Sequence, residues 1–189
     1  MPFRGEILLR RVMERLTGLA EEEIIICPGS KEYISLGIRI ASDLYPGRGS
    51  LGGLYTALFT ASQAAVAIVA CDMPFVSSDL LSYQRDILFS ENLDIVVPSS
   101  EKGLEPLHAI YRRDTCLPFV REALAAREQR LISWFKHVKV CILTTEELKP
   151  FNPRGVVFLN VNTPDEFTHA ERFPDETILI KKNHFGNEI

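Results

Sequence analysis

The chain has 189 residues, of which 46% are apolar and 24% are charged, as in globular proteins with one well-buried core. Its formal net charge is −4, from 21 basic and 25 acidic residues, so no overall basic field would recruit nucleic acid or a membrane surface. The sequence shows neither a signal-peptide pattern nor an apolar run long enough to span a bilayer. We therefore expect no nucleic-acid partner and no membrane partner.

The cysteines indicate a reducing environment. Cys27, Cys71, Cys116 and Cys141 lie far apart and form no close pair with metal-ligand spacing. Three of them fall in or beside apolar runs typical of strands. Buried thiols explain this pattern better than a disulfide framework does, so the expected location is the cytoplasm.

An amphipathic helix begins the series of predicted elements. Apolar residues at helical spacing predict it over residues 7–19, with Arg10, Arg11, Glu14 and Arg15 on its solvent side. The pattern that follows predicts, in chain order, a strand at residues 23–27, a short helix at 30–36 and a strand at 38–41.

Residues 43–53, DLYPGRGSLGG, form a predicted glycine-rich loop that leads into a helix ending near residue 62. Glycine lets the backbone approach a flat base or ribose closely, where side chains would obstruct it. The same residues also suit an ordinary turn before a helix. The position of the loop, beside Asp43 and ahead of the next strand, favours a role in binding.

The next strand is the most informative element. Small and β-branched apolar residues from position 65 predict a strand buried on both faces, which breaks at Asp72 and Pro74. Asp72 would then stand at the carboxyl end of the strand, the edge of an α/β sheet where ligands bind. A carboxylate there is a natural ligand for Mg²⁺ that carries nucleotide phosphates, although an aspartate after a strand also commonly forms a turn.

The remainder of the chain continues the alternation of strands and helices. Helices are expected at residues 77–91, 115–126 and 131–136, and strands at 94–97, 107–111, 138–143 and 156–161, with Pro98 ending the first of these strands. Such alternation predicts an α/β protein, a Rossmann-like three-layer α/β/α sandwich with a mostly parallel sheet. We expect residues 1–173 to form one domain and residues 174–189 a C-terminal tail.

The segment NVNTPDE at residues 160–166 predicts a helix start. Thr163 suits the N-cap, Pro164 the first helical position and Glu166 the second arm of a capping box. Strand alternation would put Asn160 and Asn162 on one side, where two carboxamides face a crevice. The alternative is that both asparagines only satisfy loop backbone.

One further residue invites a catalytic role. His108 lies between apolar neighbours in a predicted strand. A histidine in that setting is more often structural, so we do not assign it as a general acid.

Three segments resemble, in their order along the chain, the molybdenum cofactor guanylyltransferase family of Rossmann-like nucleotidyltransferases. They are DLYPGRGSLGGLYTAL, AIVACDMPFVSSDLL and LNVNTPDEF. The resemblance implies transfer of GMP from GTP to molybdopterin carrying molybdenum, with release of pyrophosphate and with Mg²⁺ as cofactor. It also implies molybdoenzymes or cofactor chaperones as protein partners. Two alternatives stay open: a nucleotidyltransferase of different base or substrate choice, such as a cytidylyltransferase, and a catalytically silent module that binds cofactor-handling proteins.

The resemblance also implies roles for individual residues. Asp72 would be the catalytic residue, holding Mg²⁺ and with it the GTP phosphates, and Asp43 would contact the nucleotide before the glycine loop. The remaining candidates are Gly49, Gly52 and Cys27 for the nucleotide, and Asn160 and Asn162 for the pterin substrate.

The family pattern begins with a strand and a loop that carries Gly-Gly, Arg-Met-Gly and a lysine, and this sequence starts just after that lysine. The loop would supply backbone amides and positive charge around the triphosphate. Because the first strand is central in such sheets, its absence would leave unpaired edges on its two neighbours. We hypothesise that Met1 is an internal methionine of a longer natural protein.

Overall fold

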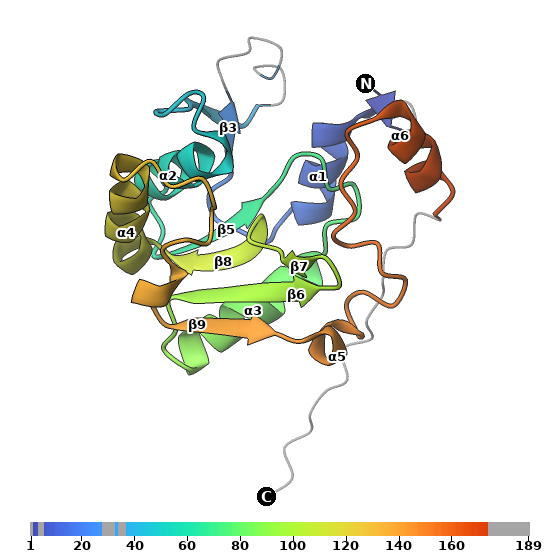
Figure 1. Ribbon diagram of the computed structural model, residues 1–189. Coiled ribbons are helices and arrows are strands. Elements are labelled where there is room, and N and C mark those ends of the chain that lie inside the picture. Colours follow the sequence, from blue (N-terminus) through green and yellow to red (C-terminus); the bar gives the residue numbers. More distant parts are fainter. Residues whose placement is uncertain (1, 4–5, 28–32, 34–36, 174–189) are drawn as a thin grey trace, which may run out of the picture.

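The computed structural model describes the chain apart from residues 1, 4–5, 28–32, 34–36 and 174–189 (Figure 1). Except for Tyr33, the predicted helix at 30–36 lies outside the described residues, and so does the predicted tail at 174–189. A two-residue ladder joins β1 (Pro2–Phe3) to β2 (Glu6–Ile7) near the start of the chain.

The strands form two separate main sheets. In the smaller one, β3 (Ile24–Cys27) and β4 (Arg39–Ser42) run parallel. The larger sheet has five strands, in which β8 lies between β5 and β6, and both β9 and β7 pair with β6. Its strands are β5 (Ala65–Val69), β6 (Ile95–Ser100), β7 (Gly103–Leu104), β8 (His108–Arg112) and β9 (Val140–Leu143).

The directions of the strands follow from their ladders. β5, β6 and β9 share one direction, whereas β8 and the short β7 run against it. Among the described residues, β3 pairs only with β4 and β5 only with β8, so no strand connects the two sheets. One edge of β3 and one edge of β5 therefore carry no ladder within the described part of the chain.

Helices cover both faces of the larger sheet. In Figure 1, α2 and α4 lie together beside one face, and α3 lies behind the strands. The helices are α1 (Leu8–Leu16), α2 (Gly49–Thr60), α3 (Ser78–Ser90), α4 (Arg113–Ala125), α5 (Thr145–Leu148) and α6 (Pro164–Glu171), with a 3-10 turn η2 (Phe135–His137) before β9.

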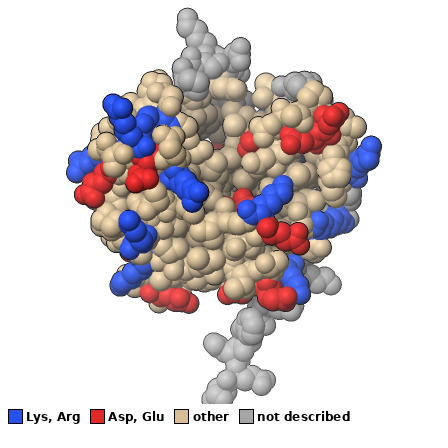
Figure 2. Space-filling model, viewed as in Figure 1, with Lys and Arg blue, Asp and Glu red and all other residues tan. Residues whose placement is uncertain are grey.

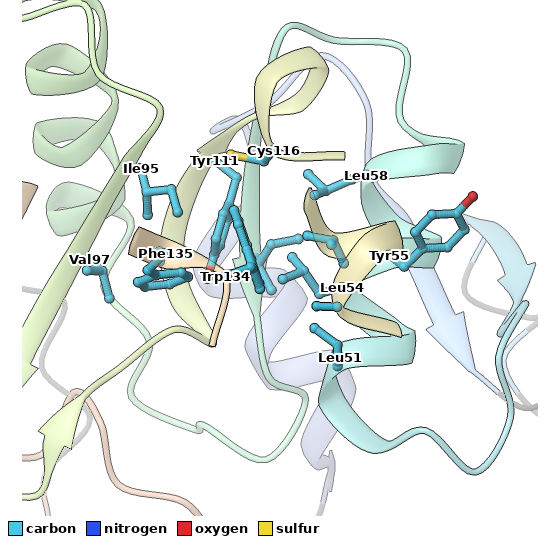
Figure 3. Close-up of a cluster of buried hydrophobic side chains, with 14 of the residues drawn as sticks. Leu51, Leu54, Tyr55, Leu58, Ile95, Val97, Tyr111, Cys116, Trp134 and Phe135 are labelled. Atoms are coloured by element: carbon cyan, nitrogen blue, oxygen red, sulfur yellow. The ribbon is translucent and has the colours of Figure 1, made fainter. Parts of the chain in front are cut away.

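The central strands divide the core into two clusters. Ile95 and Val97 of β6 pack with α2 and α4, whereas Val96 between them packs with α3. Figure 3 shows the first cluster, in which the leucines of α2 face Tyr111 of β8 and Trp134. Because consecutive residues alternate between two apolar clusters, both faces of the sheet are covered, which confirms the predicted α/β sandwich.

A third, smaller cluster joins distant parts of the chain. Phe75 and Val161 are buried together with Ala170 of α6, and Leu8 of α1 packs against them. Figure 1 accordingly shows α1 and α6 side by side. The loop after β5, where Phe75 lies, is therefore enclosed by the first and the last described helices.

The first helix differs from its prediction in the environment of two arginines. Arg11 was expected on the solvent side but is buried, and Arg15 is half-buried. Both donate to main-chain carbonyls of the loop after β5, Arg11 to Pro74 and Arg15 to Val76. An arginine is tolerated inside a protein when its donors are satisfied in this way.

Pro98 does not end β6, which continues to Ser100. The prediction was wrong because proline is harmful only where its missing N–H is needed for a ladder. Here β8 pairs with Ile95 and Val96 and goes no further along β6, and the Pro98 carbonyl accepts from the N–H of Glu105 at 2.9 Å.

Two apolar runs were assigned the wrong structure. Residues 131–136 form turns that lead into η2 instead of a helix, and residues 156–161 form turns and irregular backbone instead of a strand. Several of their apolar side chains are buried all the same: Trp134 packs in the first cluster, Val157 in the second and Val161 in the third. The apolar pattern therefore reflects tertiary burial, which periodicity alone does not distinguish from sheet formation.

The surface of the protein carries charges of both signs. On the face shown in Figure 2, Lys and Arg side chains are interspersed with Asp and Glu.

No helix in the described part of the chain is both long and apolar enough to pass through a bilayer.

Candidate functional site

The site begins with the loop that connects β5 to α3. Asp72 lies three residues beyond the end of β5 and is half-buried. Two successive turns shape this loop, with the N–H of Met73 bonded to Ala70 O and the N–H of Val76 bonded to Met73 O. The loop ends at Ser77, the N-cap of α3, whose side chain accepts from the N–H of Leu80. The predicted strand and the break after it are thus confirmed, whereas its predicted burial on both faces is wrong, because β5 is an edge strand in which only Ile68 is buried.

Asp72 carries a buried oxygen that lacks a hydrogen-bond partner. Its Oδ1 atom is shielded from solvent and accepts no hydrogen bond from the described residues. A buried acceptor of this kind destabilises the folded protein unless a hydrogen-bond donor or a cation binds to it. The described residues contain no group of three or more His, Cys, Asp or Glu side chains able to hold a metal. Mg²⁺ often needs only one or two carboxylates together with substrate phosphates, and Asp72 fits that role.

The second part of the site surrounds Asp43, just after β4. Its Oδ1 accepts from the N–H of Tyr45 at 2.9 Å and lies 3.0 Å from the hydroxyl of Thr56. Thr56 is fully buried on the inner side of α2. Sequence reasoning missed Thr56, although a threonine on the inner face of a predicted helix was an available signal. The carboxylate of Asp43 is therefore fixed in direction by its neighbours.

Cys27 supports Asp43 through its backbone. The side chain is buried at the end of β3, and its carbonyl oxygen accepts from the N–H of Asp43 at 3.3 Å. The adjacent ends of β3 and β4 thus place Cys27 and Asp43 together.

The glycine-rich segment is shorter as a loop than predicted. Helix α2 already begins at Gly49, so Gly52 and Gly53 are helical. Gly49 has φ of +57°, and a Cβ added there would meet open space. A Cβ added at Gly52 would instead lie 2.7 Å from the carbonyl oxygen of Tyr45. Gly52 therefore lets the loop pack directly on the helix, whereas Gly49 faces open space.

A hollow of about 370 Å³ lies at the start of α2. It is lined by Gly47, Arg48, Gly49, Ser50 and Leu51, and by Glu128, Gln129 and Leu131 from the segment that follows α4. Exposed backbone at the start of a helix is suited to polar or negatively charged ligand groups.

The asparagine pair lies beside Asp72. Asn160 and Asn162 are exposed on either side of buried Val161, whose N–H donates to the carbonyl oxygen of Asp72 at 2.9 Å. The segment is not a strand, yet the expected alternation of the two side chains around a buried valine holds. The two carboxamides are therefore attached, through one main-chain hydrogen bond, to the loop that carries the carboxylate.

The helix start that follows is confirmed in detail. Thr163 caps α6 and Glu166 completes the capping box, with Pro164 at the first helical position. Glu166 also accepts from the N–H of Asn162 at 2.8 Å. These main-chain donors, from Asn162 first and then Thr163, lower the pKa of the Glu166 carboxyl.

His108 lies beneath the site, away from solvent. It is fully buried in β8, and its Nε2 accepts from the N–H of Ser77 at 3.3 Å. Burial lowers the pKa of this imidazole to about 4. It is therefore neutral near pH 7 and supports the start of α3, in agreement with a structural role.

The predicted residues thus form two groups. One group contains Asp72 with Asn160 and Asn162, connected by Val161. The other contains Cys27, Asp43 and the start of α2, and no hydrogen bond joins the two groups among the described residues. Each group lies at the carboxyl end of its strands, where an α/β protein binds its ligands.

This architecture, with a carboxylate in the loop after β5, the edge strand of the larger sheet, is that of a Rossmann-like nucleotidyltransferase fold. The solved structure of molybdopterin-guanine dinucleotide biosynthesis protein A from Archaeoglobus fulgidus shares it, with a TM-score of 0.77, 24% identity and coverage of 90% of this chain and 87% of that one. The 2-C-methyl-D-erythritol 4-phosphate cytidylyltransferase of Thermus thermophilus is a more distant neighbour, with a TM-score of 0.64, 15% identity and coverage of 88% of both chains.

Sequence comparison identifies the family. The family described as "MobA-like NTP transferase domain" matches residues 1–140. A "Probable molybdenum cofactor guanylyltransferase" of Pelotomaculum thermopropionicum is 34% identical over 169 residues, which cover 87% of this chain and 81% of that protein. The molybdenum cofactor guanylyltransferase of Desulfosudis oleivorans is 28% identical, with 88% and 82% covered. The chain belongs to the MobA-like NTP transferase domain family.

Proposed function

We propose that this protein transfers GMP from GTP to the phosphate of molybdopterin carrying molybdenum, in a reaction that depends on Mg²⁺. The observation that carries the proposal is the buried Oδ1 of Asp72, which has no hydrogen-bond partner among the described residues, in a loop bonded through Val161 to the segment with two exposed asparagines. The names of the curated relatives agree with this activity. The substrates would be GTP and molybdopterin, and the products the guanine dinucleotide form of the cofactor and pyrophosphate.

In the proposed reaction, a phosphate oxygen of molybdopterin forms a bond to the α-phosphorus of GTP. The bond from that phosphorus to the oxygen of the leaving pyrophosphate breaks. Such transfers depend mainly on alignment and charge stabilisation, so the protein needs few covalent steps of its own. Asp72 would hold Mg²⁺, which when bound neutralises charge on the phosphates.

The other candidates bind and orient the two substrates. Asp43, fixed by Tyr45 and Thr56, would contact the nucleotide beside the start of α2. The open side of Gly49 leaves space for a base or ribose next to the hollow. Asn160 and Asn162 each offer a carbonyl acceptor and an amide donor, which suit the polar edge of a pterin.

We also propose a location and partners for this activity. The described cysteines are free, and such thiols stay reduced in the cytoplasm, where we place the protein. The dinucleotide product would pass to molybdoenzymes or to chaperones that carry the cofactor.

The test is a transfer assay with the purified chain, molybdenum-loaded molybdopterin and either GTP or CTP, with and without MgCl₂. We expect the guanine dinucleotide and pyrophosphate only with GTP and Mg²⁺, and a loss of about 100-fold or more in Asp72→Ala. Asp86→Ala, which removes an exposed carboxylate from α3, is the matched control and should keep full activity.

Two other results would contradict this proposal. Product formed with CTP instead of GTP would indicate a cytidylyltransferase. A folded protein with neither transfer activity nor nucleotide binding would favour the silent module that binds cofactor-handling proteins.

A further inference from the structure

Helix α1 presents a buried arginine to the loop that carries Asp72. Arg11 is only 9% exposed. Its Nε donates to the carbonyl oxygen of Pro74 at 3.0 Å, and its guanidinium carbon lies 5.6 Å from the centroid of the Phe75 ring. A guanidinium is stable in such surroundings only when it is well paired, so this contact constrains the loop as well as the arginine.

The same side of α1 makes further contacts with this loop. Arg15, one helical turn after Arg11, donates from Nε to the carbonyl oxygen of Val76 at 2.7 Å. Leu8, nearly one turn before Arg11, packs in the small cluster that contains Phe75. Helix α1 therefore contacts the loop through two carbonyls and one aromatic ring.

Asp72 relies on this backbone for its direction. Its Oδ1 has no partner among the described residues, so no hydrogen bond from them fixes that oxygen. The backbone is instead bound at two nearby carbonyls: Val161 N–H donates to the Asp72 carbonyl, and Arg11 Nε donates to the Pro74 carbonyl two residues later. Because a metal ligand must be held to within about 0.5 Å, a shift at Pro74 would displace the oxygen that meets the ion.

We infer that Arg11 is a positioning residue, which holds the Pro74 carbonyl and thereby directs the Asp72 carboxylate toward the metal ion of a bound metal–nucleotide complex. This inference rests on the proposed function of Asp72. Arg11 acts through the loop at Pro74, two residues after Asp72, whereas the asparagine segment bonds the Asp72 carbonyl itself. Arg15 bonds four residues beyond Asp72 and is more exposed, so its effect on the carboxylate should be smaller.

The experiment measures GTP binding to the full chain by calorimetry, once with Mn²⁺ and once in EDTA. Arg11→Met should weaken binding about tenfold with Mn²⁺ and leave binding in EDTA unchanged, because the lost contact acts only through the metal ligand. In an Asp72→Ala background, Arg11→Met should cause no further loss. Arg10→Met removes the same charge from the exposed side of α1 and should bind as the wild type does under both conditions.

Several outcomes would overturn the inference. One is wild-type affinity in Arg11→Met, and another is an equal loss with Mn²⁺ and in EDTA, which would mean that Arg11 only stabilises the fold. A loss that persists in the Asp72→Ala background would have the same meaning.

A second variant covers the case in which thermal unfolding shows that Arg11→Met does not fold. Arg11→Lys keeps the charge but loses the planar donor group. A loss of about threefold confined to Mn²⁺ would support the inference, and unchanged affinity would overturn it. If wild-type protein shows no metal-dependent GTP binding, the proposed function itself fails, and the inference fails with it.

Discussion

The main-chain N–H of Val161 donates to the carbonyl oxygen of Asp72 at 2.9 Å. This bond joins the segment before α6 to the loop after β5, which lies far away in the sequence. Val161 is also buried against Phe75, so an apolar contact reinforces the hydrogen bond. The segment with the exposed side chains of Asn160 and Asn162 is consequently held against the loop that carries the half-buried carboxylate, where we propose that the second substrate meets the first.

The asparagine side chains should therefore affect acceptor binding without affecting the fold. In Asn160→Ala and Asn162→Ala, we expect the KM for molybdopterin to rise about tenfold or more while the KM for GTP stays unchanged, because each loses polar contacts to one substrate only. Since Asn162 contacts Glu166 through its backbone N–H, the capping box survives its substitution. Steady-state kinetics with each substrate varied in turn would check this. Equal rises in both KM values would contradict the assignment.

Removing the Asp72 carboxylate should separate stability from activity. Its buried Oδ1 lacks a partner among the described residues, so Asp72→Ala relieves a desolvation cost. We expect the free energy of unfolding to rise by about 1 kcal/mol even though transfer activity is lost. Urea unfolding of the metal-free protein measures this. A decrease of more than about 1 kcal/mol would mean that the carboxylate stabilises the fold through another contact.

The sequence correctly predicted those features of the fold that depend only on residues close together in the chain. The apolar run before Asp72 became β5, and the pattern at Thr163, Pro164 and Glu166 became the capping box of α6. Each depends on residues within a few positions of one another. The helix predicted at residues 77–91 was likewise correct and corresponds to α3, whose N-cap Ser77 is a local signal.

The features that failed to be predicted depend on distant contacts. Arg11 reads as a solvent-facing residue of an amphipathic helix, because its acceptor, Pro74, lies 63 positions further along the chain. Residues 156–161 read as a strand because their apolar side chains are buried, although no strand pairs with them in the described structure. Gly52 read as a loop residue, whereas the nearby Tyr45 carbonyl explains why glycine is needed there.

Two adjacent glycines of α2 should respond in opposite ways to substitution by alanine. At Gly52 the added Cβ would lie 2.7 Å from the Tyr45 carbonyl oxygen, so the loop must shift and we expect a loss of about 2 kcal/mol. At Gly53 the added Cβ meets nothing within 4 Å, so alanine should stabilise the helix by about 0.5–1 kcal/mol. Urea unfolding of both variants provides the comparison. A stabilising Gly52→Ala would refute the packing role.

His108 should make the fold sensitive to mild acid. Burial lowers its pKa from 6.5 to about 4, so below pH 6.5 the unfolded chain takes up a proton that the folded chain does not accept until about pH 4. The contribution of neutral His108 to the free energy of unfolding is therefore fully present above pH 6.5 and is lost as the pH falls toward 4. Between pH 7.5 and pH 5, this one group should lower the free energy of unfolding by about 2 kcal/mol.

The measurement compares urea unfolding of the wild type and His108→Gln at these two pH values. The glutamine oxygen can still accept from the N–H of Ser77, but glutamine does not titrate. On acidification, the free energy of unfolding of this variant should therefore fall by about 2 kcal/mol less than that of the wild type. His169→Gln, which alters an exposed histidine of α6, is the matched control and should keep the wild-type pH dependence. If His108→Gln instead shows the same acid sensitivity as the wild type, the imidazole must be protonated in both states or in neither, and burial in β8 would not control its charge.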